Sequence, residues 1–106
     1  MLKHIVMWQL KEDMPEDDPG AAKTRQLNNA TVLKDKLESL SGNIPGLLKI
    51  EVGFDLSVSQ DIVLSSDLKN RDALTAYQSH PEHQAVIPFV KAVCTARRVV
   101  DYDTAS

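Results

Sequence analysis

The stretch that decides the fold is Leu2–Leu10, LKHIVMWQL, near the start of this 106-residue chain. In an extended strand, successive side chains point to opposite faces. One face would carry four apolar side chains and a histidine: Leu2, His4, Val6, Trp8 and Leu10. Ile5 and Met7 would lie on the other face. Apolar side chains on both faces predict a strand that is covered on both sides, by helices on one and by something else opposite.

The next two elements are predicted from apolar periodicity. A helix is expected to begin at Pro19 behind the cap Asp18 and to stop at Gly42. Its buried stripe would consist of Leu27, Ala30, Leu33, Leu37 and Leu40. After the turn Pro45-Gly46, apolar residues alternate with mostly polar ones and predict a strand: Leu48, Ile50, Val52, Phe54 and Leu56.

The second half of the chain is likewise predicted to contain both strands and helices. Ile62–Leu64 is predicted to pair with the preceding strand as a hairpin. Asn70 can cap a short helix that carries Ala73, Leu74 and Tyr77 and ends at His80-Pro81. Pro88 is expected to interrupt the helix that Pro81 begins, leaving short kinked pieces over 81–95. The last strand is expected over Arg97–Asp103.

This order of elements predicts an α+β fold of the ferredoxin-like type, βαββαβ, with a four-stranded antiparallel sheet. Residues 1–106 would form a single domain, with helices on one face of the sheet. The other face would be bare, yet Ile5 and Met7 make it apolar. An apolar sheet face is normally buried against a partner, so we expect a homodimer that forms through the sheet faces.

Composition limits which partners and which cellular compartment we expect. The chain is 42% hydrophobic and 25% charged, with a formal net charge of −3. It has no basic surplus to neutralise a phosphate backbone, so we expect no nucleic acid partner. No apolar run is long enough for a membrane span or a signal peptide, which predicts a cytoplasmic protein. The single cysteine, Cys94, cannot form an internal disulfide and is expected to be a small buried residue.

One cluster has the residue types of an acid–base site. Tyr77–His83 contains two of the three histidines, His80 at the expected cap of a helix and His83 one turn inside it. A helix N-terminus disfavours the imidazolium and lowers the pKa of a histidine, and a neutral imidazole can act as a general base. The alternative is that both histidines have structural roles, which are more frequent among histidines than catalytic ones. In that case His80 caps the helix, and His83 lies on the surface or in an interface.

His4 is the remaining histidine and shares a strand face with Trp8. It would line a cavity with the His80–His83 segment if that face meets the helices; otherwise it is a core histidine satisfied by one hydrogen bond. The histidine spacing is weak evidence for a metal, so we expect none. The acidic segment 12–18 lacks the ligand spacing of an EF-hand. No phosphate loop or nucleophile motif is present, and we expect no cofactor.

Three segments resemble the stress-responsive A/B barrel (Dabb) domain family: Lys3–Trp8, the segment Tyr77–His83 with its HPxH motif, and Arg98–Tyr102. The resemblance covers Leu2–Tyr102 and implies a dimeric α+β barrel. In a plant branch of the olivetolic acid cyclase type, two histidines close a linear polyketide by aldol condensation without a cofactor.

Carried over by position, the resemblance implies His4 and His83 as catalytic residues, with Tyr77 as a pocket tyrosine. Trp8 and His80 would bind the substrate, a small apolar or aromatic molecule. The chain departs from the cyclase branch in two ways: it has no aromatic residue between Pro19 and Gly46, and Trp8 would occupy part of the pocket.

Two classes of function therefore remain open. In the first, the protein is a small-molecule binder or a cofactor-free acid–base enzyme, with His83 as the base, His4 polarising a carbonyl and Tyr77 donating a hydrogen bond. In the second, the protein is a non-enzymatic stress or structural protein whose histidines pack and cap. A third interpretation, kinship with dimeric α+β barrel monooxygenases and haem-degrading enzymes, would rest on fold alone.

Overall fold

The structure is a computed structural model that describes residues 1–11, 19–55 and 61–104, with the side chains of the first helix described from residue 25 onward. Seven elements follow one another: β1 (Leu2–Leu10), α1 (Pro19–Glu38), β2 (Leu47–Phe54), β3 (Asp61–Leu68), α2 (Arg71–Ser79), α3 (Pro81–Val93) and β4 (Cys94–Asp103). The acidic segment 12–18, with its expected cap Asp18, lies outside the described residues.

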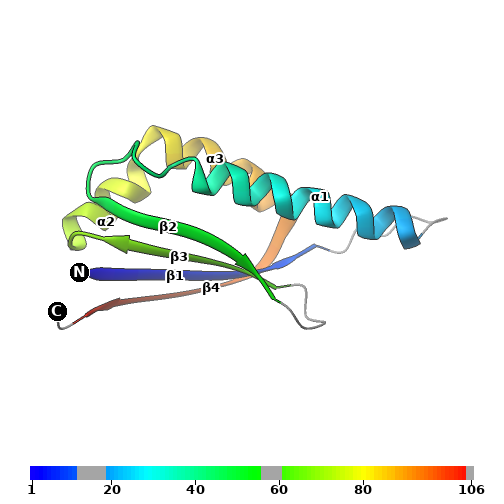
Figure 1. The fold of residues 1–106 in the computed structure, drawn as a ribbon, viewed down its shortest axis with the longest axis horizontal. Helices are drawn as coiled ribbons and strands as arrows, with labels where there is room; N and C mark the ends of the chain where they lie inside the picture. Colours follow the sequence, from blue (N-terminus) through cyan, green and yellow to red (C-terminus); the bar gives the residue numbers. More distant parts are fainter. Residues whose placement is uncertain (12–18, 56–60, 105–106) are drawn as a thin grey trace.

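The strands form one antiparallel sheet in the order β2-β3-β1-β4. All three helices lie on the same face of this sheet (Figure 1). The ferredoxin-like α+β architecture expected from the sequence is therefore confirmed. β1 occupies an inner position between β3 and β4, as its two-faced apolar pattern requires.

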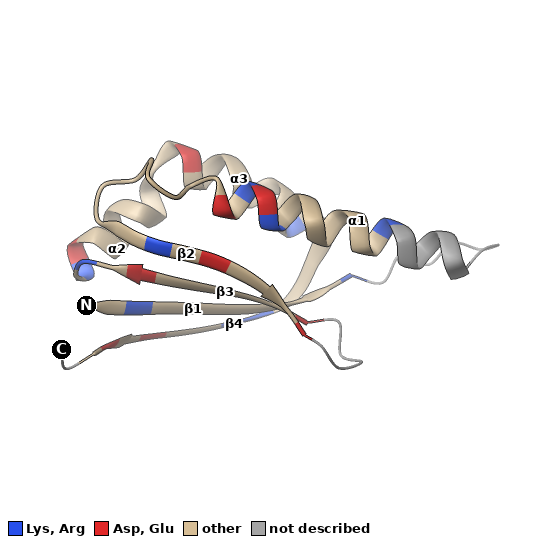
Figure 2. Cartoon of the chain, viewed as in Figure 1, with Lys and Arg blue, Asp and Glu red and all other residues tan. Residues whose placement is uncertain are grey.

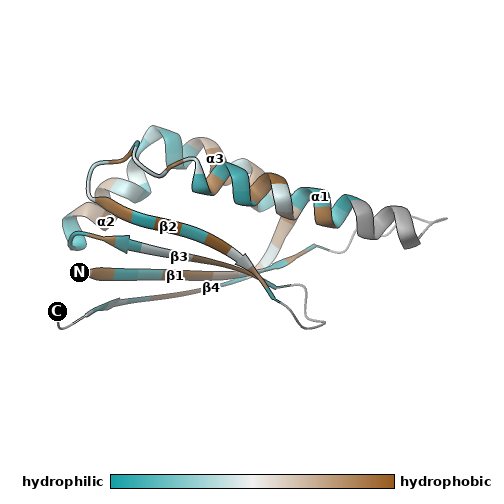
Figure 3. Ribbon diagram, in the orientation of Figure 1, coloured by the Kyte–Doolittle hydropathy of each residue, from teal (hydrophilic) through white to brown (hydrophobic). Residues whose placement is uncertain are grey.

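The core lies between the helices and the sheet. Every second residue of β1, from Leu2 to Leu10, is buried against the helices, including His4 and Trp8. Figure 3 shows brown, hydrophobic positions along β1 and along the side of α1 that turns toward the sheet. Acidic and basic residues are interspersed over the ribbon (Figure 2). No helix among the described residues is long and apolar enough to cross a membrane, and the cytoplasmic location stays a prediction.

The buried stripe of α1 differs from the predicted one at its first position. Leu27 is 57% exposed, whereas Gln26 is buried together with Ala30, Leu33 and Leu37. At roughly 100° per residue, positions 26, 30, 33 and 37 lie in one line along a helix, and position 27 lies about a quarter-turn away. The start of α1 also extends beyond the strands of the sheet (Figure 1).

The alternation predicted for β2 is broken at its start. Pairing with β3 shifts between Leu47 and Lys49, so that Leu47 is buried and Leu48 is 59% exposed. An extra residue in one strand reverses which face the neighbouring side chains occupy. Ile50 and Val52 are buried as expected, and Leu56 lies outside the described residues.

The predicted interruption at Pro88 is wrong. α3 runs as one helix from Pro81 to Val93 and contains Pro88. Proline removes one backbone donor, that toward the carbonyl of Gln84, while the other bonds of the helix remain. The packing of Val86 and Val93 in the core holds the helix on both sides of the proline. The last strand likewise begins at Cys94, three residues earlier than expected.

Replacing Pro88 with alanine is expected to raise the free energy of unfolding by about 1–3 kcal/mol, because it restores the missing helical hydrogen bond at an exposed position. Chemical denaturation of wild type and Pro88→Ala at one protein concentration measures this difference. A loss of stability in the variant would show that the proline is required by the packing of α3.

Candidate functional site

A cavity of about 310 Å³ lies between α3 and the buried face of the sheet. Its walls are mostly apolar and include Val86 and Val90 of α3. The titratable side chains that line it are His4 of β1, His83 and Lys91 of α3, and Arg97 of β4. The volume is at the lower end of the range for small-molecule pockets, which suits a single-ring compound or a short chain.

His4 reaches the cavity as the buried half of a pair with an exposed carboxylate, that of Asp101. Its Nδ1 lies 2.5 Å from Oδ1 of Asp101, and the His4 side chain is only 4% exposed. A carboxylate only accepts hydrogen bonds, so Nδ1 carries the proton and Nε2 is left for a ligand. The sequence analysis did not include Asp101 in the site. Asp101 could have been identified from the pairing of β1 with β4, which places it directly opposite His4.

His83 is held at Nδ1 in the same way as His4, but by a backbone carbonyl instead of a carboxylate. Its Nδ1 donates to the backbone carbonyl of Gln78 at 3.2 Å, which again leaves Nε2 without a proton in the neutral ring. Burial lowers the pKa of His83, the bond to Gln78 opposes this shift, and electrostatic interactions with His4 and Arg97 lower the pKa further. His83 is therefore a neutral imidazole at physiological pH, the form that accepts a proton.

The lowered pKa of His83 makes stability depend on pH. The unfolded chain binds the proton near the ordinary pKa of 6.5, and the folded protein binds it only at lower pH. The free energy of unfolding should therefore fall as pH drops below about 6.5 and level off below the folded-state pKa. Urea unfolding between about pH 7.5 and about pH 5 measures this loss. His83→Gln should lack this part of the pH dependence, and an unchanged profile would contradict the assignment.

Tyr77 of α2 lies behind the two histidines. It is fully buried, with its ring centroid 6.0 Å from that of His4 and 4.4 Å from that of His83. Its hydroxyl has no hydrogen-bond partner among the described residues, and burial raises its pKa to about 12. The phenol thus remains a protonated donor at any physiological pH. The structure brings together the three residues His4, Tyr77 and His83 that the sequence analysis singled out as catalytic.

Replacing Tyr77 with phenylalanine is expected to raise the free energy of unfolding by about 1–2 kcal/mol, because it removes a buried hydroxyl that has no partner and keeps the shape of the ring. Thermal or urea unfolding measures the change. A loss of stability would show that the hydroxyl has a structural partner, such as an ordered water.

Trp8 and His80 lie in different surroundings. Trp8 lines the cavity without filling it, and its buried Nε1 has no hydrogen-bond partner in the part of the chain that the structure describes. His80 caps α3 by accepting a hydrogen bond from the backbone N–H of Glu82 at 3.1 Å, and it does not line the cavity. Cys94 is buried, and burial raises its thiol pKa to about 11, as suits a residue that packs. No group of three metal-binding side chains converges in the described part of the chain.

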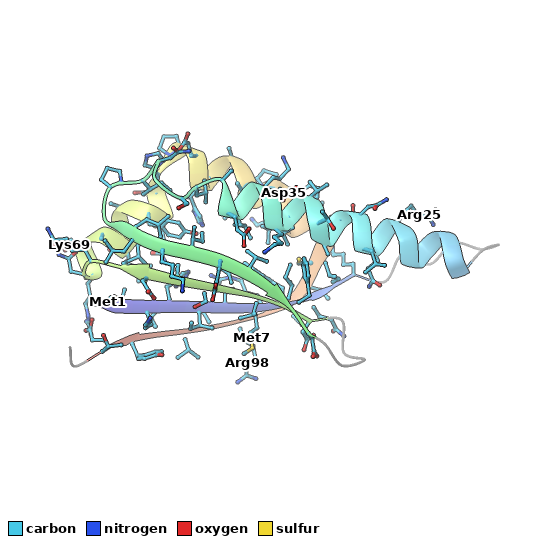
Figure 4. All side chains as sticks on the ribbon, viewed as in Figure 1. Met1, Met7, Arg25, Asp35, Lys69 and Arg98 are labelled. Carbon is cyan, nitrogen blue, oxygen red and sulfur yellow. The ribbon has the colours of Figure 1, made fainter. Side chains whose placement is uncertain are left out.

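The side of the sheet away from the helices carries a second feature, which we call the open face: Ile5, Met7, Val63, Val100 and Tyr102. Met7, Val100 and Tyr102 are 43%, 54% and 48% exposed. Strand pairing places Ile5 beside Val100 and Met7 beside Val63. Figure 4 shows Met7 projecting away from the helices on this side. The open face therefore forms one apolar surface that extends across three neighbouring strands.

Comparison with known proteins gives the following relationships. The model of the Stress Responsive A/B Barrel Domain family matches residues 2–104. An uncharacterized protein of Streptomyces coelicolor is 26% identical over 98 residues, which cover 90% of this chain and 92% of that protein. A dimeric protein of unknown function with a ferredoxin-like fold, from Bacteroides fragilis, is 30% identical and superposes with a TM-score of 0.81 over 97% of this chain and 95% of that one.

More distant structures share the architecture. A candidate antibiotic biosynthesis monooxygenase from Deinococcus radiodurans superposes with a TM-score of 0.71 over 100% of this chain and 94% of its own, at 13% identity. At that identity the likeness concerns the fold alone.

Proposed function

Because this chain belongs to the stress responsive A/B barrel domain family, we propose that it binds a small apolar or aromatic molecule in the cavity beside His4, Tyr77 and His83 and acts on it by cofactor-free proton transfer. The observation that carries the proposal is that the two histidine rings are held in the same way. Each has Nδ1 engaged, one with Asp101 and the other with Gln78, so each leaves Nε2 for the ligand.

The chemistry follows from these positions. His83, neutral and partly buried, is the base that removes a proton next to a carbonyl group. His4, held by Asp101, accepts or returns a proton on the opposite wall of the same cavity. Tyr77 supports both rings through direct contact. The apolar walls exclude water and favour the enolate-forming step of an aldol condensation, the reaction of the cyclase branch.

The experiment is proton exchange on a simple ketone. Para-butylacetophenone in D₂O exchanges its methyl protons through the enolate, and NMR follows the loss of that signal. Wild type is expected to accelerate the exchange relative to an equal concentration of the double variant His4→Gln/His83→Gln. Equal rates for the two proteins would contradict proton transfer at this site. Both proteins must first show the same folded state by circular dichroism.

The proposal includes a homodimer that forms through the open face. Supporting it are the exposed apolar side chains of β1 and β4, together with the relative from Bacteroides fragilis, which is itself dimeric. Exposed apolar surface of this kind is normally covered by a partner. Two copies that pack sheet to sheet would bury Met7 and Val100 and leave both cavities accessible on the helix side.

The second candidate is a non-enzymatic stress protein whose product is the stable dimer. The observation that favours it is the pairing of the buried His4 ring with Asp101, which is also the pattern of a structural histidine. Denaturation of His4→Ala and His83→Ala at one protein concentration separates the candidates, since the stability of a dimer depends on concentration. Losses of about 1–3 kcal/mol in both variants favour the structural function. Retained stability in His83→Ala favours the acid–base site.

A further inference from the structure

The cavity carries one sign of charge only. Its lining includes Lys91 and Arg97 beside His4 and His83, and no Asp or Glu of the described residues lines it. The chain as a whole has the opposite balance, with a formal net charge of −3. Asp101 lies beyond His4, on the far side of its ring, and does not line the cavity. A hollow with low-dielectric walls and cationic side chains attracts anions.

Neither cation is used by the fold. Lys91 and Arg97 are exposed, and the described part of the chain pairs neither with a carboxylate. The Nζ of Lys11 donates to the backbone carbonyl of Lys91 at 2.9 Å, which places a third cationic group near this end of α3. Two buried donors beside the cavity also lack partners, Trp8 Nε1 and the Tyr77 hydroxyl. The site therefore offers positive charge and hydrogen-bond donors.

A local irregularity of β4 directs Arg97 into the cavity. β1 pairs Met7 with Arg98 and Gln9 with Thr95, so two residues of β4 oppose Trp8. The extra residue is Ala96, whose φ of 53° lies in the left-handed region that residues other than glycine rarely adopt. As a result, Arg97 lines the cavity while Arg98 opposes Met7 on the open face (Figure 4). Such strain tends to persist where a side chain must be aimed.

We propose that the ligand of this cavity is a small carboxylate with an apolar body. Its carboxylate lies between Lys91 and Arg97, and its hydrocarbon part packs against Val86, Ile87 and Val90 of α3. Planar guanidinium groups bind carboxylates through two parallel hydrogen bonds, which sets the direction of the bound molecule. The inference rests on the proposed function, because it names the class of molecule that enters the same cavity.

The test uses three probes of nearly equal shape and different charge: para-butylbenzoate, para-butylbenzamide and para-butylbenzylamine. Trp8 is the only tryptophan of the chain and lines the cavity, so its fluorescence reports binding directly. The carboxylate is expected to bind at least about tenfold more tightly than the amide, and the amine more weakly than both. The preference should also weaken as salt concentration rises.

Variants locate the charge that is responsible. Arg97→Gln and Lys91→Gln are each expected to weaken benzoate binding about tenfold and to leave amide binding unchanged. Arg98→Gln is the matched control, because it removes the neighbouring arginine on the opposite face of the sheet. Sedimentation must show the same oligomeric state for every variant, since Arg98 lies beside the open face.

The outcomes separate this inference from the function on which it rests. If the amide binds as tightly as the benzoate, or if the preference for benzoate survives in Arg97→Gln/Lys91→Gln, the carboxylate assignment is wrong and the small-molecule cavity stands. If none of the three probes changes the fluorescence of Trp8, the carboxylate assignment is overturned. Ketone exchange catalysed by wild type would then still support the proposed function.

Discussion

His83→Gln is expected to slow the protein-catalysed proton exchange of para-butylacetophenone by about 10²–10⁴-fold, the usual contribution of a general base. Glutamine keeps a side-chain amide that can donate to the carbonyl of Gln78, as Nδ1 of His83 does. It has no basic nitrogen, so the proton acceptor alone is lost. The wild-type rate should increase with pH through the pKa of His83, which burial holds below 6.5, and then reach a plateau.

His80→Asn is the comparison variant. It lies in the same short segment, and asparagine retains the ability to cap α3. Since the structure places His80 away from the cavity, we expect this variant to exchange at the wild-type rate. A slow His80→Asn variant would return His80 to the ligand site, where the sequence analysis expected it to bind substrate. A wild-type rate in His83→Gln would eliminate His83 as the base.

Val100→Asp is expected to raise the dissociation constant of the proposed homodimer by at least about a thousandfold, because each unpaired buried charge costs about 3–5 kcal/mol. Val100 is 54% exposed in the single chain and lies beside Ile5 on the open face. In a symmetric dimer the substitution occurs twice, so two carboxylates would lose their water. Analytical ultracentrifugation over a range of protein concentrations measures the shift from dimer to monomer.

The matched control for this prediction is Val32→Asp. Val32 is also an exposed valine, at 41%, and it lies on α1 at the opposite side of the molecule from the open face. It should leave the dissociation constant unchanged. Equal behaviour of the two variants would contradict a dimer that forms through the sheet. A monomeric wild type would contradict the dimer altogether.

Much of the fold could be predicted from local patterns. The alternation along Leu2–Leu10 predicted which side chains enter the core, and the structure confirms both bounds of β1. Asn70 and Pro81 marked helix starts correctly, because caps and proline act through the backbone of their own turn. Leu27 and Pro88 were wrongly predicted. The exposure of Leu27 depends on which line of α1 residues faces the core, and the tolerance of the helix for Pro88 depends on core packing.

The features of the candidate site likewise fall into two groups, those that local patterns predict and those that depend on tertiary contacts. Sequence alone places His4 on one strand face with Val6 and Trp8, and places His83 in the first turn of a helix after His80-Pro81, because these positions follow from the periods of a strand and a helix. Only the tertiary structure decided that Asp101, 97 residues away, holds His4 and that Arg97 rather than Arg98 lines the cavity. Both depend on the register of β4 against β1 and on one extra residue at Ala96, which shifts every later side chain to the other face.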